Sequence, residues 1–266
     1  MTVLSPGLRR LIAGWAVGVL VLLYLPLVFV VINSFNRSRT FAFPPTGFTL
    51  QWWRAAAHSG GAWQALAASL LVGACAAAIA LVLGTMAAFA LQRHRFFGRH
   101  AVSLLLTMPI TLPGIVTGIA LGTTFTSVLG VRLSLATVVV AHATFCIVVV
   151  FNNVQARLRR LGSSLEDASA DLGATAWQTF RWVTFPQLRG ALLAGGLLAF
   201  ALSFDEIVVT TFTAGPTKTL PLWIYDNLSR PNQAPVVNVA AAVLTLAAAL
   251  PVWLAQRAGG DVTAAR

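Results

Sequence analysis

The sequence predicts an all-α integral membrane protein with about six transmembrane helices and one folded loop between the fourth and the fifth. Composition is the first observation: of 266 residues, 58% are hydrophobic and 9% are charged, against roughly a quarter charged in soluble domains. The second is that uncharged runs recur, each long enough to cross a hydrocarbon core of roughly 30 Å as a helix. The third is a polar segment, residues 161–186, which interrupts this pattern and carries helix signals of its own.

The apolar runs predict the order of the spans. One transmembrane domain is expected to cover residues 1–266, with a loop at 157–189 and spans at 11–32, 62–91, 101–126, 133–156, 190–212 and 236–256. The first run follows Arg9 and Arg10. It exceeds the roughly 7 to 15 residues of a signal-peptide core, so we interpret it as a retained span.

Two spans carry residues that predict close helix packing. Gly114, Gly118 and Gly122 lie four residues apart on one face of the third span, where a second helix can approach closely. His142, in the fourth span, is expected to make interhelical hydrogen bonds, and a proton relay is the alternative. At both places we favour packing over a ligand or proton site.

The distribution of arginine and lysine predicts that both termini are cytoplasmic. In that orientation most of the 18 positively charged residues lie inside, and the few outside are Arg37, Arg39, Arg54, Arg132, Lys218 and Arg230. This excess agrees with the positive-inside rule. Residues 161–186 are then expected to face the cytoplasm.

Several functional classes are disfavoured. The chain has no Gly-x-x-x-x-Gly-Lys-Ser/Thr loop, so it does not bind and hydrolyse ATP by that route. Its four histidines are scattered, without a nucleophile elbow or a zinc pattern, so we predict no catalytic residue and no metal site. Cys75 and Cys146 lie in apolar runs and are expected to pack as small hydrophobic residues. The net charge of +11 is spread between the spans, which disfavours nucleic-acid binding.

Residues 161–186 read LGSSLEDASADLGATAWQTFRWVTFP and predict two short helices. Ser163 and Glu166 have the spacing of a capping box, so a helix is expected to start there. Its acids fall toward the positive N-terminal half; they are Glu166, Asp167 and Asp171. Gly173 is expected to end or bend this helix, a second helix is expected at Thr175–Thr184, and Pro186 is expected to open the next span.

This segment resembles the cytoplasmic coupling loop of ABC importer permeases, whose signature is Glu-Ala-Ala, three residues, Gly, nine residues, Ile, one residue, Leu-Pro. With Gly173 as the anchor, Asp167-Ala168-Ser169 stand at Glu-Ala-Ala, Val183 at Ile and Phe185-Pro186 at Leu-Pro. Asp167 and Ser169 depart from the commonest residue types, and Glu166 lies one place early, so both Glu166 and Asp167 are candidates to meet a partner. We call residues 161–186 the coupling segment.

The resemblance implies a type I ABC importer permease fold. It assigns coupling to a partner ATPase to Glu166, Asp167, Ala168, Ser169, Asp171, Leu172, Gly173, Ala174, Val183 and Pro186. The alternative is an ordinary loop with two amphipathic turns that rest on the membrane surface.

An acid pair, Asp205 and Glu206, interrupts the fifth apolar run. An acid near the bilayer centre costs about 2.5 to 3.5 kcal/mol on insertion scales, so such residues usually face a cavity, a partner or a cation. Neighbours on a helix diverge by roughly 100°, so the two acids need not face the same cavity. We expect at least one to line a passage for a cationic solute, together with Ser203 and Phe204. The alternative is an intersubunit hydrogen bond or a polar gate without ligand contact.

The stretches SFDEIVVTTFTAG and TLPLWIYDNL resemble the fifth span and the following outer loop of ABC importer permeases for polyamines, putrescine and spermidine, in the position of their second permease subunit. The resemblance covers nearly the whole chain. It implies a bacterial inner (cytoplasmic) membrane protein, surrounded by lipid, that works with a second homologous permease chain, an ATPase dimer and a periplasmic or extracellular solute-binding protein. ATP and Mg would be bound by the ATPase, so this chain would hold no cofactor and would not be an enzyme.

Three alternatives stay open. The first is an ABC permease for another small cationic or zwitterionic solute. The second is a secondary transporter driven by an ion gradient, which would use Asp205 or Glu206 for coupling. The third is a structural membrane scaffold.

Overall fold

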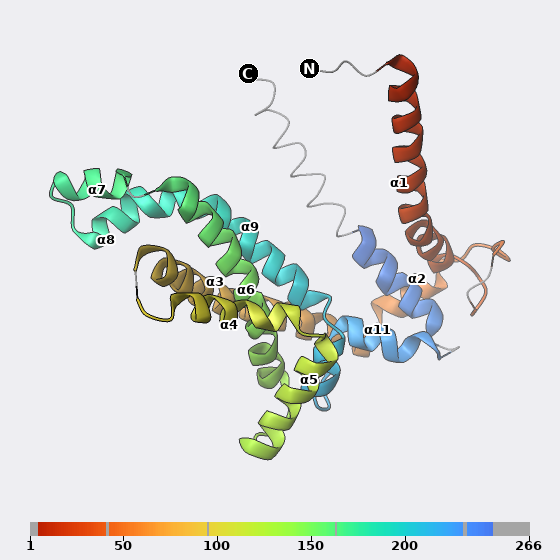
Figure 1. Ribbon diagram of the computed structural model, residues 1–266. Helices are drawn as coiled ribbons and strands as arrows, with labels where there is room; N and C mark the ends of the chain where they lie inside the picture. Colours follow the sequence, from red (N-terminus) through yellow and green to blue (C-terminus); the bar gives the residue numbers. More distant parts are fainter. Residues whose placement is uncertain (1–4, 41–42, 95, 163, 231–232, 247–266) are drawn as a thin grey trace. The chain divides into compact units, whose positions relative to one another are not determined.

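The computed structural model describes residues 5–40, 43–94, 96–162, 164–230 and 233–246, and the regular elements in these ranges are helices (Figure 1). They are α1 (Pro6–Ser34), α2 (Gln51–Ala57), α3 (Gly60–Arg93), α4 (Arg99–Thr111), α5 (Gly114–Thr123), η1 (Thr124–Val128), α6 (Leu135–Leu161), α7 (Ser164–Asp171), α8 (Ala176–Thr179), η2 (Phe180–Thr184), α9 (Phe185–Phe204), α10 (Val208–Thr213), α11 (Leu220–Leu228) and Ala234–Leu246. Contacts divide the chain into two compact units, residues 1–62 with 224–266 and residues 63–223.

The first unit begins with α1, an apolar helix that is exposed along its length. The hydroxyl of Ser5 caps it by accepting the amide of Leu8 at 3.4 Å. None of its most apolar stretch is buried, as expected for a helix that is hydrophobic all round and surrounded by lipid. Beyond α1, the indole of Trp52 donates to the carbonyl of Asn36 at 2.9 Å and so holds the following loop against the end of the helix.

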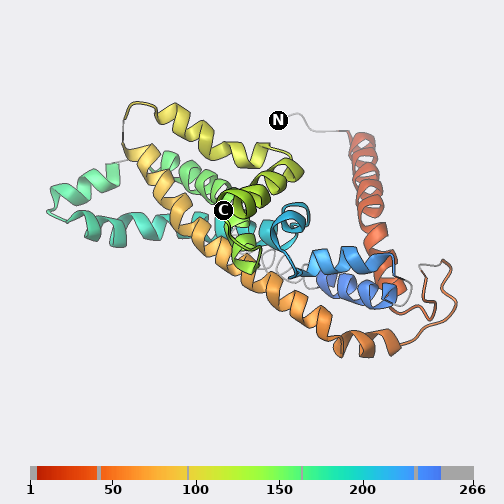
Figure 2. The ribbon, with the colours of Figure 1, turned by 90° about the horizontal axis from the view of Figure 1, so that it is seen from below.

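The second unit is built around α3, α6 and α9. A column of small residues on α3 is buried, and its members are Ala76, Ala80, Gly84 and Ala88. They repeat every four residues and therefore share one helix face. A Cβ added to Gly84 would lie 2.9 Å from the carbonyl oxygen of Ile147 on α6, so the two helices meet almost backbone to backbone. Figure 2 shows α3, in orange, crossing the green and cyan helices of this unit.

Among the described residues, four stretches are long and apolar enough to cross a membrane: Gly7–Ser34, Gly60–Arg93, Leu135–Leu161 and Ala176–Phe204. The third predicted span, 101–126, is not one straight helix, because the chain bends by 103° between α4 and the α5–η1 helix. Pro113 explains the break: it has no backbone N–H, and it holds Leu112 in an extended conformation with φ −77° and ψ 142°. If the bent pair is one span, the count is five.

The sixth predicted span, 236–256, is described only in part. An apolar helix covers Ala234–Leu246, and residues 247–256 lie outside the described residues.

The predicted packing role of the glycine face on the third span is confirmed at Gly118 and Gly122, whereas a Cβ on Gly114 would lie at an ordinary 3.6 Å from Val208. A Cβ on Gly118 would lie 2.8 Å from Cδ2 of Phe212, and one on Gly122 would lie 2.6 Å from the Phe212 carbonyl oxygen. A side chain at either position would push α10 away from α5. These glycines therefore hold α10, and the acid pair that precedes it, close against the rest of the second unit.

Candidate functional site

The coupling segment forms two short helices joined by a turn at one end of the second unit (Figure 1). Helix α7 comes first, and α8 with η2 leads back toward α9. The hydroxyls of Ser169 on α7 and Thr179 on α8 lie 3.0 Å apart and hydrogen-bond the two helices to each other. Ser163, the predicted capping residue, lies outside the described residues.

Gly173 ends α7 in a left-handed conformation, with φ +82°. Its amide donates to the carbonyl of Ala170 at 2.9 Å, and the amide of Ala174 donates to Ser169 at 3.1 Å. Together these are the two hydrogen bonds of a Schellman motif, which satisfy carbonyls that the helix end leaves unpaired. A Cβ at Gly173 would meet nothing within 4 Å. Glycine is thus required here by backbone conformation and not by space.

The second helix of the segment runs without interruption into the next span. Thr175 caps it, and the Gln178 side chain accepts the Thr175 amide at 2.8 Å. The helix then passes through the π-helical turn η2 into α9, so Ala176–Phe204 is one helical stretch of 29 residues. The predicted second helix and the predicted fifth span are therefore a single element. Pro186 lies in the first turn of α9, directly after the wider η2 turn, and in a regular α-helix its ring would crowd the carbonyl four residues earlier.

Glu166 is bonded inside the chain. Its Oε1 accepts Nη2 of Arg93 at 2.6 Å and the hydroxyl of Thr184 at 2.9 Å. Arg93 also donates through Nη1 to the carbonyl of Gly162 at 3.1 Å. One carboxylate thus connects the end of α3, the start of α7 and the η2 turn. We call Arg93, Glu166 and Thr184 the brace.

The coupling segment presents acids and large apolar side chains on its surface. Asp167 and Asp171 are exposed, and Leu172, Trp177 and Trp182 are 90%, 65% and 71% exposed. Of the other residues assigned to coupling, Ala168 and Pro186 are exposed and Ser169, Ala174 and Val183 are half-buried. Apolar side chains grouped on a surface beside charged ones are typical of a protein docking face.

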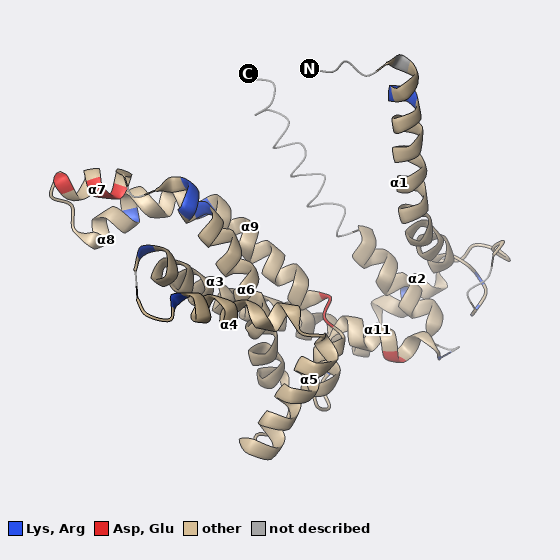
Figure 3. Ribbon diagram, in the orientation of Figure 1, with Lys and Arg blue, Asp and Glu red and all other residues tan. Residues whose placement is uncertain are grey.

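The acid pair lies at a break between α9 and α10. Figure 3 shows it as red ribbon at the end of α9, with a second red group on α7. Glu206 is half-buried, and its Oε1 accepts the amide of Val209 at 2.9 Å, which caps α10. Asp205 is exposed. The two neighbours therefore have different surroundings: one holds a helix end and the other is open.

The two residues predicted to accompany the acids are both held inside the chain, Ser203 by a residue of α6 and Phe204 by a residue of its own helix. The hydroxyl of Ser203 is buried and lies 2.8 Å from Nδ1 of His142. The ring of Phe204 is 5.9 Å from that of Phe200 on the same helix.

His142 is confirmed as an interhelical hydrogen-bonder. It is fully buried, and besides its contact with Ser203 its Nε2 lies 3.0 Å from the hydroxyl of Thr210 on α10. One side chain of α6 therefore bonds to both sides of the α9–α10 break.

Sequence reasoning missed Arg93, Thr184 and Thr210. Arg93 had one available signal, since it is the first charge after a long uncharged span. The two threonines had none, because a hydroxyl in or beside an apolar run can equally bond back to its own helix.

Several apolar spans, a surface of acids and large apolar side chains on a helix that continues into one of them, and an acid at a break in that same span are the features expected of a membrane transporter subunit. Residues 80–258 match the family described as "Binding-protein-dependent transport system inner membrane component", and the chain belongs to this family.

Similar proteins agree with this assignment. The chain is 34% identical over 241 residues to the putrescine transport system permease protein PotI of Escherichia coli (strain K12), covering 86% of this chain and 85% of PotI. It is 33% identical over 256 residues to the spermidine/putrescine transport system permease protein PotC of the same strain, covering 96% of each. Its fold matches a chain of a bacterial ABC transporter involved in import of the acidic polysaccharide alginate, with a TM-score of 0.72 over 96% of this chain and 99% of that chain, at 14% identity. The fold is therefore that of ABC importer permeases.

The brace makes a prediction about stability. Glu166→Gln removes the charge from a half-buried ion pair, and we expect a loss of about 1 kcal/mol, seen as a melting temperature lower by about 2 to 4 °C. Asp167→Asn, one residue later and exposed, is the matched control and should leave the melting temperature unchanged. Equal shifts of the melting temperature in the two variants would show that the ion pair of Glu166 does not stabilise the fold.

The conformation of Gly173 makes a second prediction. Gly173→Val should cost about 1 to 2 kcal/mol, because a β-branched residue is strained at positive φ. Gly173→Asn should cost less, since asparagine tolerates the left-handed region. The readout is hydrogen exchange at the Ala174 amide, which the Schellman bond protects; wild-type protection in the valine variant would contradict the expectation.

Proposed function

We propose that this chain is one permease subunit of an ATP-driven importer for small polyamine cations such as putrescine or spermidine. The observation that carries the proposal is identity of 33% to 34% to two polyamine permeases over most of both chains. The exposed carboxylate of Asp205, at a break in an otherwise apolar span, supplies the negative charge that a cationic solute would need along its path.

The energy would come from partner subunits. The chain has no phosphate-binding loop, so an ATPase dimer would bind ATP and Mg, and this chain would bind no cofactor. A second homologous permease would complete the pore, and a solute-binding protein would deliver the polyamine. The docking face for the ATPase is the exposed surface of α7 and α8, with Asp167 and Asp171 as its acids.

The shape of the second unit supports a lever mechanism. Because Ala176–Phe204 is one helical stretch, a shift of α8 in the cytoplasm would move the far end of α9, where Asp205 lies. The brace would make α7, η2 and the end of α3 follow the same movement. Switching between two such positions is alternating access. In this arrangement one transmembrane domain spans the chain, and both termini are cytoplasmic.

Transport itself is the direct test. We expect proteoliposomes that hold the complete complex to take up labelled putrescine and spermidine only with ATP and the binding protein. Asp205→Asn should reduce uptake about tenfold, since it removes a charge that attracts the cation. Glu206→Gln should reduce uptake less, because a glutamine oxygen can still accept the Val209 amide.

Three results would contradict the transport proposal in different ways. Full uptake by both variants would exclude a role of the acid pair in the passage. ATP turnover without uptake of either polyamine would leave the importer architecture standing and exclude polyamine as the solute. Uptake driven by an ion gradient without ATP would point to a secondary transporter.

The docking face is tested separately from transport. Asp167→Lys should weaken copurification with the ATPase about tenfold or more, because charge reversal at an interface is strongly unfavourable. Ser164→Lys places a lysine on the exposed surface of the same helix without removing an acid, and it should have little effect. Wild-type copurification of the Asp167 variant would show that this acid does not meet the ATPase.

A further inference from the structure

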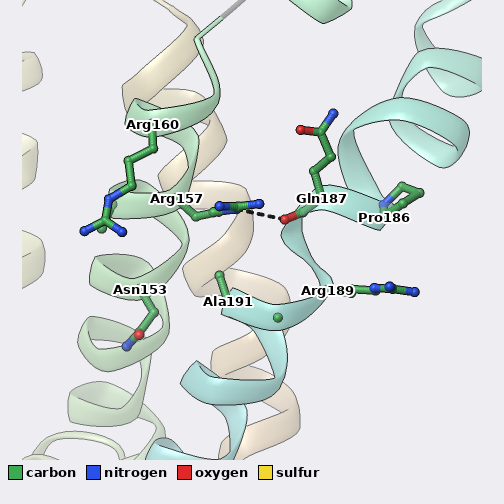
Figure 4. Close-up of a pocket in the computed structure, with 9 residues that line it drawn as sticks. Asn153, Arg157, Arg160, Pro186, Gln187, Arg189 and Ala191 are labelled. Atoms are coloured by element: carbon green, nitrogen blue, oxygen red, sulfur yellow. Dashed lines mark hydrogen bonds between the residues drawn. The ribbon is translucent and has the colours of Figure 1, made fainter. Parts of the chain in front are cut away.

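Three arginines are among the residues that line an open cavity of about 580 Å³ between α6 and α9 (Figure 4). Arg157 and Arg160 come from α6 and Arg189 from the first turns of α9. In the figure Arg157 lies between the two helices, where its Nε donates to the carbonyl of Gln187 at 3.0 Å, and the other two arginines extend to either side. The cavity is at the end of the second unit that carries the coupling segment.

The charge of this pocket is not neutralised by its own lining. No acid is among the residues that line it. Neither α6 nor α9 contains an acid. The first acid after α6 in the sequence is Glu166 on α7, which is already bonded to Arg93 at 2.6 Å, and Asp205 and Glu206 follow the opposite end of α9. A guanidinium presents several donors in a flat fork that matches phosphate oxygens. The pocket is therefore suited to an anion with phosphate chemistry.

The depth of the pocket matches the headgroup layer of a membrane. Helix α6 is uncharged from Leu135 to Ala156, a run that at 1.5 Å per residue is about 33 Å long and so close to the roughly 30 Å of a hydrocarbon core. Arg157 and Arg160 then lie within about 6 Å of the end of this run along the helix, where headgroups begin.

An apolar strip continues from the pocket toward the membrane interior. Arg189, Leu193 and Leu197 are spaced four residues apart and so share one face of α9. The two leucines are 67% and 70% exposed. An arginine at headgroup depth beside exposed leucines matches a molecule that has a phosphate at one end and hydrocarbon at the other. Free phosphate would contact the arginines but would leave the leucines uncovered.

We propose that this pocket binds the phosphodiester headgroup of an anionic phospholipid, with the acyl chains along Leu193 and Leu197. Basic pockets between spans on the cytoplasmic side are suited to such headgroups. The bound lipid would connect α6 to α9 in the cytoplasmic half of the Ala176–Phe204 helical stretch. This site does not depend on which solute is transported.

The experiment measures lipid binding to the full chain with its copurifying subunits, by native mass spectrometry. The delipidated complex is titrated with phosphatidylglycerol, with phosphatidylcholine, and with phosphatidylglycerol in the presence of millimolar inorganic phosphate. Removing both charges in Arg157→Gln/Arg189→Gln should weaken phosphatidylglycerol binding about 25-fold, or about fivefold per arginine. Arg159→Gln is the matched control, because Arg159 lies on the same helix but bonds to Gln155 and does not line the pocket.

Each outcome decides for or against the site. Loss of phosphatidylglycerol in the double variant alone, with phosphatidylcholine weak throughout, supports it. Unchanged binding, or equal loss in the Arg159 variant, overturns it. Displacement of the lipid by inorganic phosphate would identify the ligand as a free anion and would overturn the proposal. Loss of the second permease from the double variant without loss of lipid would identify the pocket as a protein interface and would also overturn it. If the double variant does not fold, Arg157→Lys/Arg189→Lys keeps the charge and should still bind more weakly than wild type; equal affinity overturns the proposal.

Discussion

A bilayer offers no water to backbone groups, so each N–H and C=O within it must be paired inside the protein. The break between α9 and α10 satisfies this constraint with side chains. Glu206 accepts the Val209 amide, and the hydroxyl of Thr210 donates to the Glu206 carbonyl at 2.6 Å. At the far end of α10, the hydroxyl of Thr137 donates to the carbonyl of Thr213 at 2.7 Å. Because these bonds are made, a span can carry an interruption with an open acid at a defined position.

The same division of roles occurs twice in the chain. Glu166 and Asp167 are neighbours, as are Asp205 and Glu206, and in each pair one carboxylate bonds within the chain and the other is exposed. Glu166 and Asp167 lie on α7, where successive residues point about 100° apart and so reach different surroundings. Asp205 and Glu206 lie at the break between α9 and α10, where Glu206 turns to the first amides of α10. The bonded acid holds local geometry and leaves its neighbour available to a partner or a solute.

One helical stretch connects these two places. Ala176–Phe204 starts shortly after the turn at Gly173 and ends directly before Asp205, and its 29 residues correspond to roughly 43 Å of helix. Along the way it packs on α6, and it passes the arginine pocket near its start. A single element therefore connects the proposed docking face, the proposed lipid site and the open acid, so a movement at one of them would be passed to the others.

The sequence by itself determined the membrane class, most of the span positions, the glycine turn at Gly173 and the close packing at Gly118 and Gly122, because composition, run length and glycine spacing act locally. Only the tertiary structure decided which acid of each pair is engaged, since Arg93 lies 73 residues from Glu166 in sequence. It also decided that α8 continues through Pro186 and that α4 and α5 bend at Pro113. The arginine pocket likewise joins residues 30 or so positions apart. Such partners are chosen by proximity in space, which helix signals along the chain do not encode.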